Sequence, residues 1–168
     1  MQDIEGFILD IECGENAKGN VNIDCYIPKK IPVNFVLGSA ERLPFKEKSF
    51  DCVRSSYLIE HLLDPVNFIQ NCTKIATKKI VIITDNSDWL GELYFRLVGS
   101  GRIFHAEHCY KWSVEYMRTL LSRLGKKAIV KPCNLSPTLI VKFLSLLGNL
   151  PRIGILFYRD IYVEVKID

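Results

Sequence analysis

Short apolar runs, separated by polar turns, fill the first half of the chain and predict five strands. Each run ends at a polar residue, a glycine or a proline, and the last is rich in β-branched residues. Runs of this length are typical of strands buried on both faces of a parallel sheet. The predicted strands cover residues 7–11, 21–27, 34–37, 50–53 and 79–84.

Helical signals lie between and after these strands. Asp64 and Pro65 predict a helix start, because aspartate accepts a hydrogen bond at the N-cap and proline suits the first helical position. Ser113 predicts a second start. The apolar residues after Ser113 share one helical face until Gly125, which suits a left-handed C-terminal cap. Two further apolar stretches, Trp89–Val98 and Leu139–Leu147, also predict helices.

Two extended segments near the end of the chain, 128–130 and 155–167, predict an antiparallel pair at the edge of the sheet. Strands that alternate with helices favour an α/β fold with right-handed crossovers. We therefore predict one domain over residues 1–168, with no linker. Its fold is an open, doubly wound, mainly parallel seven-stranded sheet with an antiparallel last strand and helices on both faces.

The connection between the first two predicted strands is unusually short. A parallel crossover that contains a helix needs about a dozen residues or more. The segment between residue 11 and residue 21 is shorter than that. We therefore expect a compact loop or a single turn in place of the helix.

Composition narrows the class of protein further. Hydrophobic residues make up 48% of the chain and charged residues 24%, which is an ordinary globular balance. The net charge of +3 is too small to demand a nucleic-acid partner. The acidic residues near Met1 argue against a signal peptide, and no apolar run reaches the ~20 residues of a membrane-spanning helix. Six scattered cysteines favour buried thiols, so we expect a cytoplasmic protein.

Polar residues that follow the predicted strands are the candidates for chemistry, because open α/β sheets bind ligands beyond the carboxyl ends of their strands. Four segments in or directly after these strands form a pattern: Ile8–Gly14 (ILDIECG), Ala40–Phe45 (AERLPF), Ser49–Val53 (SFDCV) and Leu58–Pro65 (LIEHLLDP). In order and spacing they resemble motifs of the class I Rossmann-like methyltransferases that use S-adenosylmethionine. The short spacing from Cys13 to Asp24 is similar to a compact subgroup with a shortened first crossover. The resemblance covers residues 6 to about 85.

The resemblance implies S-adenosylmethionine as cofactor and assigns each segment a role. The turn at Glu12–Gly14 approaches the amino-acid part of the cofactor, and Asp24 accepts hydrogen bonds from both ribose hydroxyls. Ser39–Glu41 borders the adenine, and Ser55–Tyr57 borders the methyl group and its acceptor. The cofactor-binding residues implied are Asp10, Glu12, Cys13, Gly14, Asp24, Cys25, Ser39, Ala40, Glu41, Ser55, Ser56 and Tyr57.

Methyl transfer requires mainly in-line placement of the acceptor and exclusion of water, and a base only where the acceptor must lose a proton. Three residues are candidates for that base. His105 is the first choice, because it lies in the variable region after the fifth strand; Tyr57 lies beside the expected methyl position. His61 is a third candidate, although packing or a local hydrogen bond on a short helix is the commoner role for such a residue.

Rival hypotheses remain open at the level of sequence. Glu12 stands where the motif usually has glycine, and Ser39 stands where it often has aspartate. Both departures are also consistent with a catalytically silent protein that keeps the fold for binding or assembly. A nicotinamide-dependent oxidoreductase is disfavoured, because no G-x-G-x-x-G opens a helix after the first strand.

Partners are not specified by any motif. A small molecule, a protein or a nucleic acid is each consistent with the sequence as methyl acceptor. Leu139–Leu147 is apolar around most of a helical circumference, which indicates core packing or a contact surface for a homodimer or a partner. The segment 105–109 contains residue types that bind zinc, but the sequence shows no second cluster, so we expect no metal site.

We predict that Asp24→Ala weakens S-adenosylmethionine binding at least about tenfold, because a charged hydrogen bond contributes roughly 1.5–3 kcal/mol. Isothermal titration calorimetry measures the dissociation constant directly. An unchanged constant in a folded variant would remove Asp24 from the cofactor site.

Overall fold

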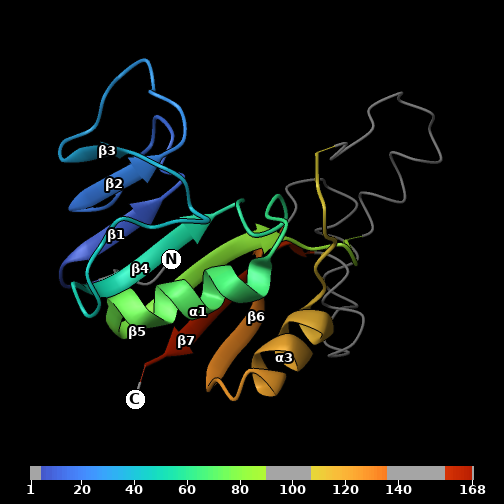
Figure 1. Ribbon diagram of the computed structural model, residues 1–168. Coiled ribbons are helices and arrows are strands. Elements are labelled where there is room, and N and C mark those ends of the chain that lie inside the picture. The colour runs from blue at the N-terminus through green and yellow to red at the C-terminus, as the bar shows by residue number, and fades with distance from the viewer. Residues whose placement is uncertain (1–4, 90–106, 136–157, 168) are drawn as a thin grey trace, which may run out of the picture.

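The computed structural model describes residues 5–89, 107–135 and 158–167. In these residues seven strands form one sheet in the order β3-β2-β1-β4-β5-β7-β6 (Figure 1). The strands are β1 (Ile8–Ile11), β2 (Val21–Asp24), β3 (Phe35–Leu37), β4 (Phe50–Ser56), β5 (Ala76–Asp85), β6 (Ala128–Leu135) and β7 (Tyr158–Lys166). The order changes direction between β1 and β4, where doubly wound folds bind their ligands.

The pairing of the strands confirms the predicted mixed sheet. β1 to β5 are parallel to one another, and β7 is antiparallel to both β5 and β6. The largest differences from the predicted strand bounds are that β4 extends to Ser56, β5 begins at Ala76, β6 extends to Leu135, and β2 ends at Asp24 instead of residue 27. The early end of β2 has a local cause, because the Asp24 carboxylate accepts a hydrogen bond from the backbone N–H of Tyr26 and turns the chain.

Two helices are described, and both begin where their caps were predicted. α1 (Pro65–Ile75) has Asp64 as its N-cap, and α3 (Val114–Arg123) has Ser113. Each cap side chain accepts a hydrogen bond from a backbone N–H of the first turn. Gly125 has a φ of 66°, as expected of a left-handed C-terminal residue. The predicted helix Leu139–Leu147, and Trp89–Val98 from residue 90 onward, lie outside the described residues.

Both described helices pack on one face of the sheet. Phe68 and Ile69 of α1 and Met117 and Leu121 of α3 lie in one buried cluster with the side chains that β1, β4, β5 and β7 direct to that face. The opposite face carries a smaller cluster, which consists of Ile8, Cys52, Val81, Ile83 and Tyr162. Successive side chains of β5 point to opposite faces of the sheet. Ile80 and Ile82 therefore belong to the first cluster and Val81 to the second.

The β1–β2 connection is a loop of turns and bends with no helix, which confirms the expected compact crossover. The side chain of Asn22 on β2 holds this loop in place. It accepts a hydrogen bond from the Gly19 N–H and donates to the Gly19 and Val33 carbonyls. Gly19 approaches β1 so closely that a Cβ atom there would lie 2.4 Å from the Val21 carbonyl oxygen and 2.8 Å from the Asp10 nitrogen.

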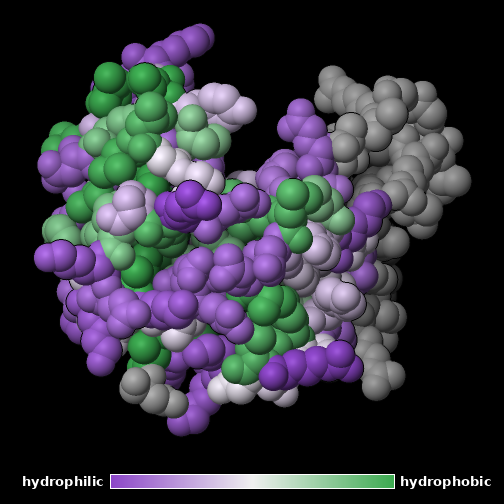
Figure 2. Space-filling model, in the orientation of Figure 1, coloured by the Kyte–Doolittle hydropathy of each residue, from purple (hydrophilic) through white to green (hydrophobic). Residues whose placement is uncertain are grey.

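Large apolar side chains are exposed along the β2–β3 connection and on β3, where Figure 2 shows a hydrophobic area. Tyr26, Ile27, Ile31, Val33 and Leu37 are all more than half exposed. The segment is too short to contain the helix that usually covers this part of such a sheet. In the described part of the chain, no helix has the length and apolar character needed to cross a membrane.

We predict that Gly19→Ala destabilises the protein by roughly 1–3 kcal/mol, because the new methyl group would collide with backbone atoms that cannot move aside. Urea denaturation measures the loss. Gly125→Ala is the control: its Cβ would meet nothing within 4 Å, so only the strain of a positive φ remains. An equal loss in both variants would contradict the close approach at Gly19.

Candidate cofactor and acceptor site

The sheet places the predicted cofactor-binding segments along one edge. Glu12–Gly14 follows β1, Asp24 and Cys25 lie at the end of β2, Ser39–Glu41 follows β3, and Ser55–Tyr57 ends β4. These strands are parallel neighbours, so their carboxyl ends share that edge. The topology therefore groups residues that are more than forty positions apart in the sequence.

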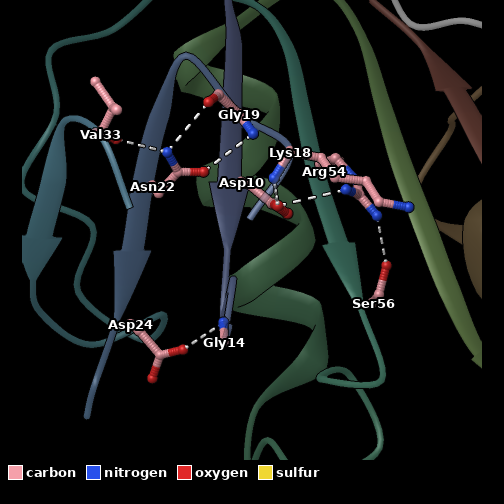
Figure 3. Close-up of polar contacts among 9 residues, drawn as sticks. All are labelled: Asp10, Gly14, Lys18, Gly19, Asn22, Asp24, Val33, Arg54 and Ser56. Carbon is pink, nitrogen blue, oxygen red and sulfur yellow. Dashed lines mark hydrogen bonds and ion pairs between the residues drawn. The ribbon is translucent and has the colours of Figure 1, made fainter. Parts of the chain in front are cut away.

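Asp24 joins the end of β2 to the glycine turn. Its carboxylate accepts hydrogen bonds from the backbone N–H of Gly14, at 2.9 Å (Figure 3), and from that of Tyr26, at 3.0 Å. Each carboxylate oxygen has a second acceptor position, so these two bonds leave capacity for ribose hydroxyls. Asp24 is buried, and its orientation is set before any ligand arrives.

Glu12 stands where the motif usually has glycine, and its backbone keeps the conformation that glycine favours. Its φ of 53° lies in the left-handed region that glycine adopts without cost. The side chain turns toward the end of β2, where its Oε2 atom lies 3.6 Å from the Cys25 sulfur. Burial and the neighbouring Asp24 carboxylate raise the pKa of Glu12, so two acidic groups lie at the place where the resemblance implies the ribose.

Asp10 has partners inside the protein. Its Oδ2 atom accepts from the Lys18 N–H at 2.8 Å and lies 3.3 Å from Nη1 of Arg54 on β4 (Figure 3). Both members of this ion pair are buried, and burial raises the pKa of Asp10 while the Arg54 charge opposes that effect. Arg54 also donates to the Ser56 hydroxyl at 2.9 Å. This group of contacts ties β1, β4 and the β1–β2 loop together.

The remaining serines differ in environment. Ser39 is exposed, and its hydroxyl accepts from the N–H of Glu41 beside the buried Ala40. The Ser55 hydroxyl is buried at the end of β4 and has no hydrogen-bond partner among the described residues. A buried hydroxyl without a partner is costly, which is consistent with a ligand atom or a water at that position.

Tyr57 is held in a strained position at the end of β4. Its φ is 55°, unusual for an aromatic residue, and its hydroxyl donates to the buried carboxylate of Asp160 at 2.8 Å. Arg159 contacts both groups, at 3.2 Å from the Tyr57 hydroxyl and 3.1 Å from Asp160. Burial and Asp160 raise the pKa of Tyr57 to about 12, so this phenol holds its proton at neutral pH and acts as a donor.

A pocket of about 300 Å³ opens beside Tyr57, at the carboxyl ends of β4 and β5. Four aromatic residues and several polar groups form its walls. The lining residues are Tyr57, Glu60, Asp85, Asn86, Ser87, Trp89, His108, Tyr110, Lys111, Trp112 and Arg159. Strained backbone, aromatic walls and buried polar atoms at the ligand-binding edge of an α/β sheet are typical of an acceptor site.

The structure describes two of the three histidines, His61 and His108. His105 lies outside the described residues. His61 is exposed in a single turn, and the prediction of a short helix at Glu60-His61 is wrong, because only one turn forms before α1 begins. The His61 ring lies against His108, with ring centroids 4.5 Å apart, and its Nδ1 atom is 3.3 Å from the Glu107 carbonyl oxygen.

Sequence reasoning missed most of the pocket. Asp85 ends β5 and Asn86 follows it, and both come directly after the strand predicted over 79–84. The rule applied to the first four strands, that polar residues after a strand are candidates, would therefore have found them. Arg159 and Asp160 carry no such signal. They lie near the start of β7. Because β7 is antiparallel to β5, its first residues lie at the carboxyl end of β5, on the ligand-binding edge.

Residues 10–83 match the family model described as a methyltransferase domain. No curated protein matches the chain. Similar structures include a SAM-dependent methyltransferase from Thermotoga maritima, with 17% identity and a TM-score of 0.74 over 99% of this chain and 84% of the other. An Archaeoglobus fulgidus SAM-dependent methyltransferase has 19% identity and a TM-score of 0.65, over 95% and 85%. The Synechocystis magnesium protoporphyrin IX methyltransferase, with bound SAH, has 13% identity and a TM-score of 0.61, over 97% and 74%.

The chain has the fold of the class I S-adenosylmethionine-dependent methyltransferases, and residues 10–83 match a methyltransferase domain. Its strand order, its antiparallel β7 and the motifs at the carboxyl edge all agree with this class. The methyl acceptor is not determined by them, because one fold serves many acceptors.

We predict that Arg54→Met lowers the free energy of unfolding by roughly 3–5 kcal/mol at neutral pH, because it leaves the buried Asp10 carboxylate without a cation. The pKa of Asp10 is already raised by burial and rises further without Arg54. The folded variant is therefore destabilised while Asp10 is ionised. The loss in the free energy of unfolding shrinks as the pH falls and Asp10 binds a proton.

Urea denaturation between pH 5 and pH 8 checks this prediction. Lys78→Met is the matched control, since Lys78 pairs with Asp51 on the surface and its loss should have a much smaller effect. A deficit in Arg54→Met that stays constant across the pH range would contradict the role assigned to Asp10.

Proposed function

We propose that this methyltransferase transfers a methyl group to a small molecule that enters the pocket beside Tyr57. The observation that carries the proposal is the pocket itself: about 300 Å³, at the carboxyl ends of β4 and β5, next to the Ser55–Tyr57 segment. Its volume lies at the lower end of the range for small-molecule sites. A nucleic acid would instead be expected to meet a dense basic face, which a net charge of +3 does not favour.

The proposed cofactor site is the edge formed by the ends of β1, β2, β3 and β4. Asp24 would accept the ribose hydroxyls, and the backbone of the Glu12–Gly14 turn would lie against the amino-acid part of the cofactor. Gly14 supports this role, because its φ of 52° and the open space where a Cβ would stand leave room for a ligand. The Ser55–Tyr57 segment would then lie between the sulfonium and the acceptor.

Four aromatic rings in the pocket favour a planar or apolar acceptor. Tyr110 and Trp112 are stacked, with centroids 5.6 Å apart, and Tyr57 and Trp89 add to the walls. Such rings contribute apolar surface and define orientation, which is most of what methyl transfer requires from the protein. The Tyr57 hydroxyl, kept protonated by its raised pKa, would donate a hydrogen bond to the acceptor or stay with Asp160.

Titration with S-adenosylmethionine and with S-adenosylhomocysteine tests the cofactor site first. Micromolar binding of both, lost in Asp24→Ala, supports the proposal and justifies a screen of small phenols, thiols and amines as acceptors. No binding at millimolar ligand to folded protein would favour the catalytically silent alternative, in which Glu12 and Asp24 have lost their ligand.

We predict that Ser87→Phe, which fills the pocket, lowers turnover of any small acceptor at least about tenfold and leaves the dissociation constant for S-adenosylhomocysteine unchanged. Release of S-adenosylhomocysteine measures turnover. Ser122→Phe, on the exposed surface of α3, is the control and should retain activity. Full turnover in Ser87→Phe would exclude the pocket as the acceptor site.

A further inference from the structure

Glu60, His61 and His108 form a cluster at one wall of the pocket. One ligand atom from each residue, a carboxylate oxygen or a ring nitrogen, lies within 4.8 Å of the other two. The segment that carries His108 is fixed there by the backbone, because the Glu60 carbonyl oxygen accepts from the N–H groups of Cys109, at 2.8 Å, and Tyr110, at 3.1 Å. The cluster is therefore produced by the fold from two segments that are far apart in the sequence.

The carboxylate of Glu60 is the unusual member. Glu60 is 1% exposed, and its Oε2 atom accepts from the Thr84 hydroxyl at 2.9 Å. Its Oε1 atom is buried and has no hydrogen-bond partner among the described residues. A buried carboxylate oxygen without a hydrogen bond or a cation is costly. A cation beside Oε1 would remove that cost.

The donor set selects the kind of cation. Two imidazoles and one carboxylate suit zinc and similar first-row metals, whereas magnesium and calcium prefer oxygen ligands throughout. Three protein ligands with a fourth position open to a pocket are the usual arrangement of a catalytic zinc site. Ligands of one zinc ion lie about 3–4 Å apart, since each bond is about 2.0–2.2 Å long, so binding requires the three side chains to draw closer, and the exposed His61 is the least confined of them.

We propose that Glu60, His61 and His108 bind one zinc ion at the wall of the pocket. A polar group that can orient the ring lies beside each of the two imidazoles. The Glu107 carbonyl oxygen lies 3.3 Å from Nδ1 of His61, and Asp85 Oδ2 lies 4.0 Å from Nε2 of His108. Histidine ligands of metals commonly donate their second ring N–H to such groups.

The site also indicates the chemistry of the acceptor, and this part rests on the proposed function. A hydroxyl or thiol in the pocket would bind the open position of zinc and lose its proton to solvent. The resulting oxygen or sulfur anion would attack the methyl carbon of S-adenosylmethionine. The carbon–sulfur bond breaks, and its electron pair stays on the sulfur of S-adenosylhomocysteine.

Zinc titration of the metal-free protein tests the site without cofactor or acceptor. We expect one equivalent of zinc to bind, by calorimetry and by metal analysis after dialysis. We expect binding to weaken at least about 100-fold in His61→Ala, because even residues that only support metal ligands contribute 10–100-fold. His61 is exposed, so this variant should keep its fold.

Glu60→Gln and Glu107→Gln are matched variants, since both remove one carboxylate and only Glu60 belongs to the cluster. Zinc binding should fall in the first and persist in the second. Zinc that still binds to His61→Ala and Glu60→Gln would be held elsewhere, for example by the six cysteines, and would overturn the proposal. The proposal would also be overturned if the unmodified protein bound no zinc. Titration with S-adenosylhomocysteine alone separates this outcome from a failure of the cofactor site.

Discussion

The Asp10–Arg54 ion pair is the constraint around which the β1–β2 edge of this protein, our proposed cofactor site, is built. A shortened connection between β1 and β2 removes the helix that would otherwise cover the sheet and hold the loop in place. The Asp10 carboxylate takes over that function, because it accepts from the Lys18 N–H of the loop and faces Arg54 on β4. Asn22 and the close approach of Gly19 hold the same end of the loop, and Asp24, which accepts from the Gly14 N–H, holds the other. The glycine turn and Asp24 are then set at the carboxyl edge by a loop that has no helical support.

The pocket beside Tyr57 depends on a second buried carboxylate. Asp160, fully buried at the start of β7, receives hydrogen bonds from Tyr57, Asn134 and Arg159. These residues come from the end of β4, from β6 and from β7, so one group connects the antiparallel hairpin to the parallel part of the sheet. It also holds Tyr57 in its left-handed conformation and turns it toward the pocket. Two buried acids thus organise the edge of the sheet at which we propose that the methyl donor and the acceptor meet.

Much of the fold was predictable because its signals are local. The apolar runs of β1 and β5, the caps at Asp64 and Ser113 and the glycine after α3 each depend on a few neighbouring residues. The short crossover followed from counting residues, and the family motifs pointed to the edge of the sheet. Predictions failed where side-chain contacts overrode the pattern. The run at 21–27 is apolar enough for a longer strand, but Asp24 turns the chain, and the residues after it are exposed.

The sequence by itself determined the order of the elements, the methyltransferase motifs and the segments that lie at the carboxyl edge of the sheet, because periodicity, caps and motifs are encoded in short stretches. Only the tertiary structure decided which distant residues share a site. It paired Asp10 with Arg54, joined Tyr57 to Asp160 and placed His108 beside Glu60 and His61. The reason is physical: strand order and the antiparallel entry of β7 decide which side chains become neighbours, and burial then decides which of their charges and hydrogen bonds must be matched.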